Sequence, residues 1–238
     1  MARLKTAQTL SIVIPSLNEA SNLPLLIADL KRWPNQLEIC VCDGCSSDLS
    51  VQVAELAGAK VVQGLEPNRG KQLHFGACNT NQKWLLFLHA DSRLATNWPK
   101  AVEKIINNKT SENVAWFFDF KMQSDGLLLK LMEISVAIRS NLFNRPYGDQ
   151  GLLINRSLYK KINGYKPLHL MEDLDLVIRL SKDFSLKRIG IPIYVNGRSW
   201  EQVSVLLKAW KNANLRKKWR EGKSSKNLSL EYYRKYVA

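Results

Sequence analysis

The first half of the chain alternates short apolar runs with stretches whose apolar residues recur at helical spacing. Leu10–Ile14 and Trp84–His89 are nearly continuous apolar runs, which is typical of strands buried on both faces. Ala20–Lys31 instead carries leucines and isoleucine three or four positions apart, which predicts a helix. The predicted strands are residues 10–14, 37–43, 60–63, 84–89 and 113–120, and the predicted helices are residues 20–31, about 47–57, 70–79 and 95–107.

This strict alternation predicts a parallel sheet with helices on both faces. Such sheets bind ligands beyond the carboxyl ends of their strands, so the residues that follow each strand are candidates for a site. Polar and acidic residues occur there after three strands: Ser16, Asn18 and Glu19; Asp43, Ser46, Ser47 and Asp48; His89, Asp91 and Ser92. The packing of a core does not require this pattern.

The second half is less regular. Asp125–Ser140 is very apolar but shorter than the roughly 18 to 20 residues that span a bilayer. Residues 144–151 form a predicted loop before a short strand at 152–154, and Met171–Leu180 begins as a cluster of acids and continues as a helix. Short strands are expected around Pro192, and Glu201–Arg220 is a long basic helix. No repeat or low-complexity linker interrupts the chain, so we expect one domain over residues 1–238.

Composition narrows the class of protein. Hydrophobic residues make up 45% and charged residues 24% of the 238 residues, as in an average globular protein. The N-terminus has no apolar core of a secretory signal, which predicts a cytoplasmic protein. The net charge of +14 is uneven, because residues 182–238 hold 14 Lys and Arg against 4 Asp and Glu. Such a tail attracts nucleic acid, anionic lipid or phosphorylated ligands, or is a solvated end.

The four cysteines and three histidines do not form a zinc motif. Cys40 and Cys42 flank Val41 in a predicted strand, so both point to one face and Val41 points to the other. We interpret them as small buried side chains.

Carboxylates and one basic motif are stronger candidates for chemistry. Glu172, Asp173 and Asp175 stand at a predicted helix start, where the helix dipole favours negative charge. Asp91 ends an apolar strand, a position from which one carboxylate can hold Mg²⁺ or Mn²⁺ together with phosphate oxygens. The motif Arg69-Gly70-Lys71 stands at the start of a predicted helix, and Lys71 can pair with a diphosphate there.

Five motifs then occur in an order that resembles a known family. They are SIVIPSLNE at residues 11–19, CDGCSSD at 42–48, RGK at 69–71, LHAD at 88–91 and MED at 171–173. Over about residues 10–190 the chain resembles the inverting family 2 glycosyltransferases of the GT-A fold. It is most similar to a bacterial branch with H-A-D where most members have D-x-D, and residues 196–200 resemble an Arg/Trp motif of that branch. The resemblance implies an α/β fold with a Rossmann-like, mostly parallel central sheet flanked by helices and a C-terminal helical extension.

The resemblance implies a donor site in about residues 8–120. Its nucleotide-sugar-binding residues would be Pro15, Leu17, Glu19, Asp43, Lys71, His89, Ala90 and Asp91. Asp43 would accept a hydrogen bond from the base, uracil being favoured over guanine, and Lys71 would lie near the base or the diphosphate. Asp91 would bind the divalent metal, whereas His89 replaces an Asp of most relatives.

The resemblance places the acceptor side in about residues 121–200. Asp173 would be the general base, with adjacent Glu172 as the fallback. Candidate contacts to the acceptor or the diphosphate are Asp149, Gln150, Arg198 and Trp200. The chemistry agrees, because sugar transfer requires a cation at the leaving diphosphate and a carboxylate to take the acceptor proton.

Three other readings remain open. A nucleotidyltransferase on a similar fold would carry a Gly-rich basic loop after the first strand, where this chain has the acidic sequence PSLNE. An inactive nucleotide-sugar-binding relative is compatible with His89. A nucleic-acid-binding protein agrees with the charge, but no nucleic-acid motif is present.

The basic tail at residues 201–238 suggests a partner beyond the donor. Its apolar stripe consists of Val203, Leu206, Leu207, Trp210 and Ala213, with Lys and Arg concentrated toward its C-terminal half. This pattern suits a helix lying in a lipid interface at the inner face of the membrane, which a lipid-linked acceptor would require. The alternatives are packing on its own domain and a homodimer interface.

Overall fold

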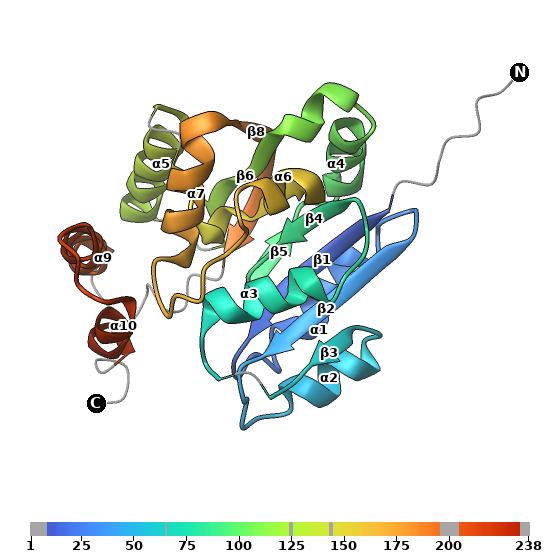
Figure 1. Cartoon of the computed structure of the whole chain (residues 1–238), viewed down its shortest axis with the longest axis horizontal. Coiled ribbons are helices and arrows are strands. Elements are labelled where there is room, and N and C mark those ends of the chain that lie inside the picture. Colours follow the sequence, from blue (N-terminus) through green and yellow to red (C-terminus); the bar gives the residue numbers. More distant parts are fainter. Residues whose placement is uncertain (1–8, 65, 124–125, 143–144, 196–204, 234–238) are drawn as a thin grey trace, which may run out of the picture.

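The fold is built on one eight-stranded sheet (Figure 1). The computed structural model describes residues 9–64, 66–123, 126–142, 145–195 and 205–233. The strands are β1 (Leu10–Ser16), β2 (Leu37–Asp43), β3 (Lys60–Val62), β4 (Trp84–Phe87), β5 (Ser92–Leu94), β6 (Val114–Met122), β7 (Leu152–Asn155) and β8 (Ser185–Val195). Their order across the sheet is β3-β2-β1-β4-β7-β6-β8-β5.

Helices cover both faces, as the alternating pattern predicts. One face packs against α1 (Leu23–Leu30), α2 (Ser50–Leu56) and α4 (Trp98–Ile106), and the other packs against α3 (Arg69–Cys78), α6 (Arg156–Lys161) and α7 (Glu172–Asp183). Two separate cores result, because successive strand side chains point to opposite faces. Cys40 and Cys42 both lie in the second core with their Sγ atoms 3.9 Å apart, while Val41 lies in the first, which confirms the period-2 prediction.

The sheet is not parallel throughout. β1 to β4 are parallel to one another where they pair, and β6 is parallel to β8. β7 is antiparallel to both β4 and β6, and β5 is antiparallel to β8, so the sheet is mixed, with its antiparallel pairs confined to β4–β7, β7–β6 and β8–β5. β5 was missed because its three residues, Ser92–Leu94, carry no apolar periodicity. Residues 187–195 belong to one strand, β8, rather than to several short ones.

One buried carboxylate connects the far edge of the sheet to its first half. Asp29 on α1 is almost fully buried and accepts hydrogen bonds from Arg93 Nε at 2.7 Å and from the backbone N of Leu94 at 3.1 Å. Both donors lie on or beside β5, although β5 is at the opposite edge from β3. The sheet therefore curls, and β5 packs beside α1. Residues 88–91 connect β4 to β5.

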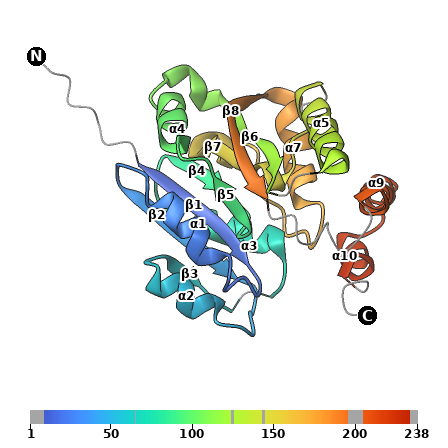
Figure 2. The same ribbon diagram turned by 180° about the vertical axis from the view of Figure 1, so that it is seen from behind.

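The second half adds helices beside the sheet. α5 (Leu127–Leu142) packs on β6, and short turns η1 (Lys109–Asn113) and η2 (Gly148–Gln150) precede β6 and β7. α9 (Val205–Arg220) corresponds to the described part of the predicted basic helix, and α10 (Ser225–Tyr233) follows it without having been predicted. Figures 1 and 2 show both helices at the periphery, below α5. In the part of the chain that the structure describes, every helix is too short or too polar to cross a bilayer.

The loop before α7 docks on the start of α3. The backbone N of Gly70 donates to Leu168 O at 3.1 Å, and Asn68, the N-cap of α3, donates from its side chain to Pro167 O at 3.2 Å. A methyl group at Gly70 would collide with Lys166 O and lie 2.7 Å from Leu168 N. The glycine of the RGK motif is thus required because a second stretch of backbone crosses it. This crossing places the start of α7 beside the sheet edge.

Candidate functional site

A cleft of about 490 Å³ opens at the carboxyl ends of β1 and β4. We call it the strand-edge cleft. Its wall consists of Pro15, Ser16, Leu17, Glu19, Pro67, Arg69, Gln72, His89, Ala90, Asp91, His169 and Ser229. Six of the eight predicted donor-site residues therefore line one cavity, and its volume lies in the range of small-molecule sites, about 300–1,000 Å³.

Lys71 does not line this cleft. Its ammonium forms an exposed ion pair with Glu66, whereas Arg69, two residues earlier, reaches into the cleft. Arg69 also forms an ion pair with Glu172, which is fully buried at the start of α7. The RGK motif was the signal for a basic residue here, but helical rotation, not sequence order, decides which of its two cations faces the cavity.

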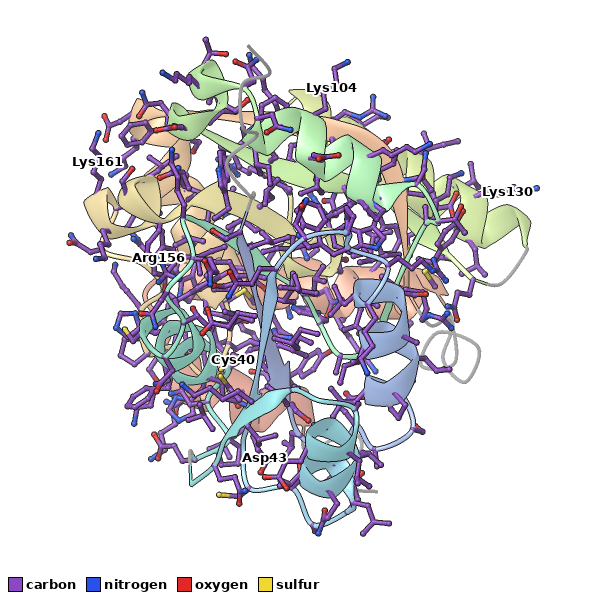
Figure 3. All side chains as sticks on the ribbon, turned by 90° about the vertical axis from the view of Figure 1, so that its right-hand side faces the viewer. Cys40, Asp43, Lys104, Lys130, Arg156 and Lys161 are labelled. Atoms are coloured by element: carbon purple, nitrogen blue, oxygen red, sulfur yellow. The ribbon has the colours of Figure 1, made fainter. Side chains whose placement is uncertain are left out.

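Asp43, at the end of β2, is not among the residues that line the cleft. Its side chain is only 4% exposed, and Oδ2 accepts a hydrogen bond from Ser46 N at 2.9 Å. Oδ1 has no partner among the described residues. Gln72 bridges the Ser16 and Cys42 carbonyls at 2.9 and 2.8 Å, which fixes the ends of β1 and β2 side by side. Figure 3 labels Asp43 three residues after Cys40 on β2.

Four polar side chains meet where the cleft approaches α7. Nε2 of His89 lies 3.8 Å from Oδ2 of Asp173. Within the described ranges, four buried atoms here lack a hydrogen-bond partner: His89 Nε2, Asp149 Oδ1, Glu172 Oε2 and Asp173 Oδ1. Unpaired buried polar atoms cost free energy, so a cluster of them indicates a site completed by a ligand.

Burial shifts the protonation of this cluster. It raises the pKa of Asp173, with the charge of Arg69 opposing that shift and the charge of Asp149 reinforcing it. Burial raises the pKa of Glu172 as well, again opposed by Arg69. The pKa of His89 is lowered by burial and by Arg69, so its neutral imidazole is favoured. Asp173 thus binds a proton more readily than an ordinary aspartate does, as functional carboxylates often do.

The backbone approaches Asp173 unusually closely at Gly148. A methyl group at Gly148 would collide with Oδ2 of Asp173 and lie 2.6 Å from Nε2 of His89. Met171, the N-cap of α7, has φ +70°, a left-handed conformation that a non-glycine residue adopts at a cost of about 1–3 kcal/mol. Both features fix the direction in which α7 presents Asp173.

A second cavity of about 320 Å³ lies on the other side of Asp173, between α7, α9 and α10. We call it the helix-side pocket. It is lined by Arg69, Tyr147, Leu170, Met171, Glu172, Asp173, Leu174, Asn212, Leu215, Arg216 and Tyr232. Arg69 lines both cavities, and Asp173 faces this one while contacting His89 of the other. A reacting pair held one in each cavity would meet at Asp173.

The remaining predicted contacts have different surroundings. Asp149 belongs to the cluster of unpaired atoms. The Gln150 side chain is buried, donates to Phe118 O at 3.2 Å and accepts from Ser140 Oγ at 2.7 Å, so it braces the loop against β6 and α5. Arg198 and Trp200 lie outside the described residues.

Asp91 is the predicted metal ligand, and its carboxylate lines the strand-edge cleft. Among the described residues, no group of three His, Cys, Asp or Glu side chains is arranged to hold an ion. Asp91 lines the cleft, and its charge helps to raise the pKa of Glu19, after burial as the larger cause, so two carboxylates act on one part of the cavity. One or two carboxylates suffice for Mg²⁺ when phosphate oxygens supply other ligands. The donor set therefore fits an ion that arrives with a phosphorylated ligand.

Comparison with known proteins yields one family. The sequence model described as "Glycosyl transferase family 2" matches residues 11–161, more than half of the chain. The 4,4'-diaponeurosporenoate glycosyltransferase of Staphylococcus haemolyticus is 32% identical over 111 residues, 44% of this chain and 29% of that protein. An uncharacterized glycosyltransferase of Haemophilus influenzae is 26% identical over 196 residues, 77% of this chain and 66% of that protein. The chain thus spans less than two thirds of each relative.

Solved structures share the fold. Staphylococcus aureus TarS 1–349 superposes with a TM-score of 0.64 at 16% identity, over 80% of this chain and 61% of that one. Glucosyl-3-phosphoglycerate synthase of Mycobacterium tuberculosis, solved with Mn²⁺, UDP and glucosyl-3-phosphoglycerate, gives a TM-score of 0.53 at 20% identity, over 77% and 71% of the two chains. These likenesses support the GT-A architecture.

The tight contact at Gly148 leads to a stability prediction. We expect Gly148→Ala to lower the free energy of unfolding by about 1–3 kcal/mol, because the methyl group must displace a packed carboxylate. Denaturant titration measures this, with Gly126→Ala as the control, since a methyl group there meets only Leu129 at an ordinary 3.7 Å. In an Asp173→Ala background the cost of Gly148→Ala should shrink. If Gly148→Ala lowers the free energy of unfolding equally with and without Asp173→Ala, the methyl group does not collide with Asp173.

Proposed function

The chain belongs to glycosyl transferase family 2, and from that membership we propose that it moves a sugar from a nucleotide-diphosphate sugar to an acceptor hydroxyl with inversion at the anomeric carbon. The observation that carries the proposal is the meeting of two cavities at Asp173: the strand-edge cleft reaches it through His89, and the helix-side pocket contains it. Donor and acceptor bound one in each would face each other across one carboxylate.

The donor belongs in the strand-edge cleft. Pro15 and Leu17 offer apolar surface for a base and ribose, and Arg69 offers a cation to a diphosphate. We propose a UDP-sugar, with the unpaired Oδ1 of Asp43 as the acceptor for the base. Two family-fold structures support this choice, because TarS was solved with UDP-GlcNAc and glucosyl-3-phosphoglycerate synthase with UDP.

Asp91 is the residue that we propose to hold a divalent metal at the diphosphate. When bound, Mg²⁺ or Mn²⁺ would offset the negative charge that grows on the leaving diphosphate. His89 stands two residues before Asp91, and the low pKa of its imidazole keeps this neighbour neutral. Arg69 lines the same cleft and contributes a fixed positive charge.

Asp173 is the proposed general base. It takes the proton of the acceptor hydroxyl as the acceptor oxygen bonds to the anomeric carbon, while the bond from that carbon to the diphosphate breaks and its electron pair leaves with the nucleotide. Because attack and departure are on opposite sides, the configuration inverts and no covalent enzyme intermediate forms. Glu172, buried against Arg69, is proposed to position α7 rather than to accept the proton.

An additional proposal concerns a lipid surface. Leu207, Trp210 and Ala213 of the predicted apolar stripe are exposed on α9, whereas Val203 and the side chain of Leu206 lie outside the described part. On α5, Leu131, Ile134 and Ile138 are also exposed. Apolar side chains near many lysines and arginines suit the surface of an anionic membrane, from which a lipid-linked acceptor would be reached.

Asp173→Asn tests the base. We expect turnover of a UDP-sugar to fall by at least about 10²-fold, because the amide cannot take a proton, while donor affinity changes little. In the unchanged protein, the acidic limb of the pH–rate profile should lie above the ordinary range of an aspartate, since burial raises the pKa of Asp173 and the base works only when deprotonated. If the pH–rate profile of Asp173→Asn keeps the same acidic limb, another group accepts the proton of the acceptor hydroxyl.

Asp91→Ala tests the metal without relying on turnover. Titration calorimetry with UDP should show that Mn²⁺ raises UDP affinity about tenfold or more in the unchanged protein, and that this gain disappears in Asp91→Ala. Lys71→Ala is the matched control, because Lys71 pairs with Glu66 outside the cleft. An undiminished Mn²⁺ effect in Asp91→Ala would exclude Asp91 as the ligand.

Vesicle flotation tests the lipid surface. We expect the protein to float with anionic vesicles at low salt, and Trp210→Ser to reduce the floating fraction several-fold, because Trp210 is 65% exposed on α9. Leu56→Ser, at an 87% exposed position on α2, should leave it unchanged. A protein that stays soluble on anionic vesicles but sediments as a dimer that Trp210→Ser dissociates would make the stripe a dimer interface.

A further inference from the structure

The helix-side pocket has an amphiphilic wall. Leu170, Leu174 and Leu215 contribute apolar surface, with the ring of Tyr232 beside them. Two arginines, Arg69 and Arg216, line the same cavity. Arg69 forms an ion pair with Glu172 and also lines the strand-edge cleft. Arg216 on α9 is the cation whose role the fold leaves open.

Arg216 belongs to a pair of like charges around one ring. Its guanidinium carbon lies 5.5 Å from the centroid of Tyr147, and that of Arg139 on α5 lies 3.7 Å from the same centroid. Over the described ranges neither arginine forms an ion pair with a carboxylate. Arg139 instead donates to Arg145 O at 3.1 Å and to Gln150 Oε1 at 3.3 Å, both uncharged. The ring holds both cations, which repel each other.

This arrangement is costly without an anion. The pKa of Arg139 is lowered mainly by burial; the charges of Asp149 and Tyr147 oppose this shift, and the charge of Arg216 adds to it. Desolvated cations that lack an ionic partner are destabilising unless a ligand supplies the counter-charge. A planar guanidinium suits a phosphate or a carboxylate, which accept two parallel hydrogen bonds.

We propose that the helix-side pocket binds an acceptor that is an anionic amphiphile, with its phosphate or carboxylate group on Arg216 beside Tyr147 and its apolar part against Leu215 and Tyr232. The claim that this ligand is the sugar acceptor rests on the proposed function. It adds the chemical class of that acceptor and a residue, Arg216, that selects it.

The position of the charges agrees with this orientation. Asp173 and Glu172 line the α7 side of the pocket, and Arg216 lines it from α9. An anion bound at Arg216 avoids the carboxylate of Asp173, and a hydroxyl elsewhere on the same molecule is free to approach that carboxylate. An uncharged amphiphile would gain the apolar wall but leave the arginine pair uncompensated.

Binding of a simple probe tests the inference. Dodecyl phosphate below its micellar concentration, titrated by calorimetry, should bind about tenfold or more tightly than inorganic phosphate, which lacks the chain, and than dodecyl maltoside, which lacks the charge. Dodecanoate tests whether a carboxylate replaces the phosphate. Arg216→Gln should weaken dodecyl phosphate by about tenfold or more, and Arg216→Lys, which keeps the charge but loses the planar fork, should lie between.

Arg220→Gln is the matched control, because Arg220 is an exposed arginine one turn further along α9 and does not line the pocket. It should leave dodecyl phosphate affinity within about twofold. Equal effects of Arg216→Gln and Arg220→Gln, or equal affinity for dodecyl phosphate and dodecyl maltoside, would overturn the inference.

The titration of UDP with Mn²⁺ separates this inference from the proposed function. Arg216→Gln should bind UDP normally, and Asp91→Ala should bind dodecyl phosphate normally, because the two ligands occupy different cavities. Failure of UDP to bind the unchanged protein contradicts sugar transfer and leaves the anionic-amphiphile pocket standing. Failure of dodecyl phosphate with normal UDP binding contradicts only the pocket.

Discussion

The ion pair between Arg69 and Glu172 joins the two halves of the molecule, and the site depends on it. Arg69 begins α3 in the first half, and Glu172 begins α7, 103 residues later. Glu172 is fully buried, so removal of Arg69 would leave an uncompensated charge, which costs about 3–5 kcal/mol in proteins. Gly70 allows the loop before α7 to cross α3 directly beside this pair. The pair therefore holds α7 at the sheet edge and places its neighbour Asp173 between the two cavities.

Several features around Asp173 are destabilising for the folded protein. The left-handed backbone at Met171, the close approach of Gly148 and the unpaired oxygens of Asp149, Glu172 and Asp173 are each unfavourable in isolation. Burial raises the pKa values of Asp173 and Glu172, and the charge of Arg69 opposes both shifts. These surroundings suit the role of general base that we propose for Asp173.

Local sequence determined most of the first half. Apolar runs predicted β1, β2 and β4 because strands buried on both faces require nearly continuous hydrophobicity, and helical spacing predicted α1, α3 and α4. The rule that parallel strands present their carboxyl ends together also brought Glu19, His89 and Asp91 to one cavity. Where the pattern was short or polar, as in β5, or where helices followed the basic tail, as in α10, the sequence carried too little periodicity to predict the element.

The sequence by itself thus determined the fold class, the cleft and the acids at the start of α7, since each follows from the local order of apolar and polar residues. Only the tertiary structure decided that Arg69 rather than Lys71 faces the cleft, because that depends on the rotation of α3 against the loop crossing Gly70. It also decided that Arg139 and Arg216 meet at Tyr147, since these residues come from α5, α9 and the loop between β6 and β7. Tyr147 and Arg216 are 69 positions apart along the chain, so their contact arises from packing and no local pattern encodes it.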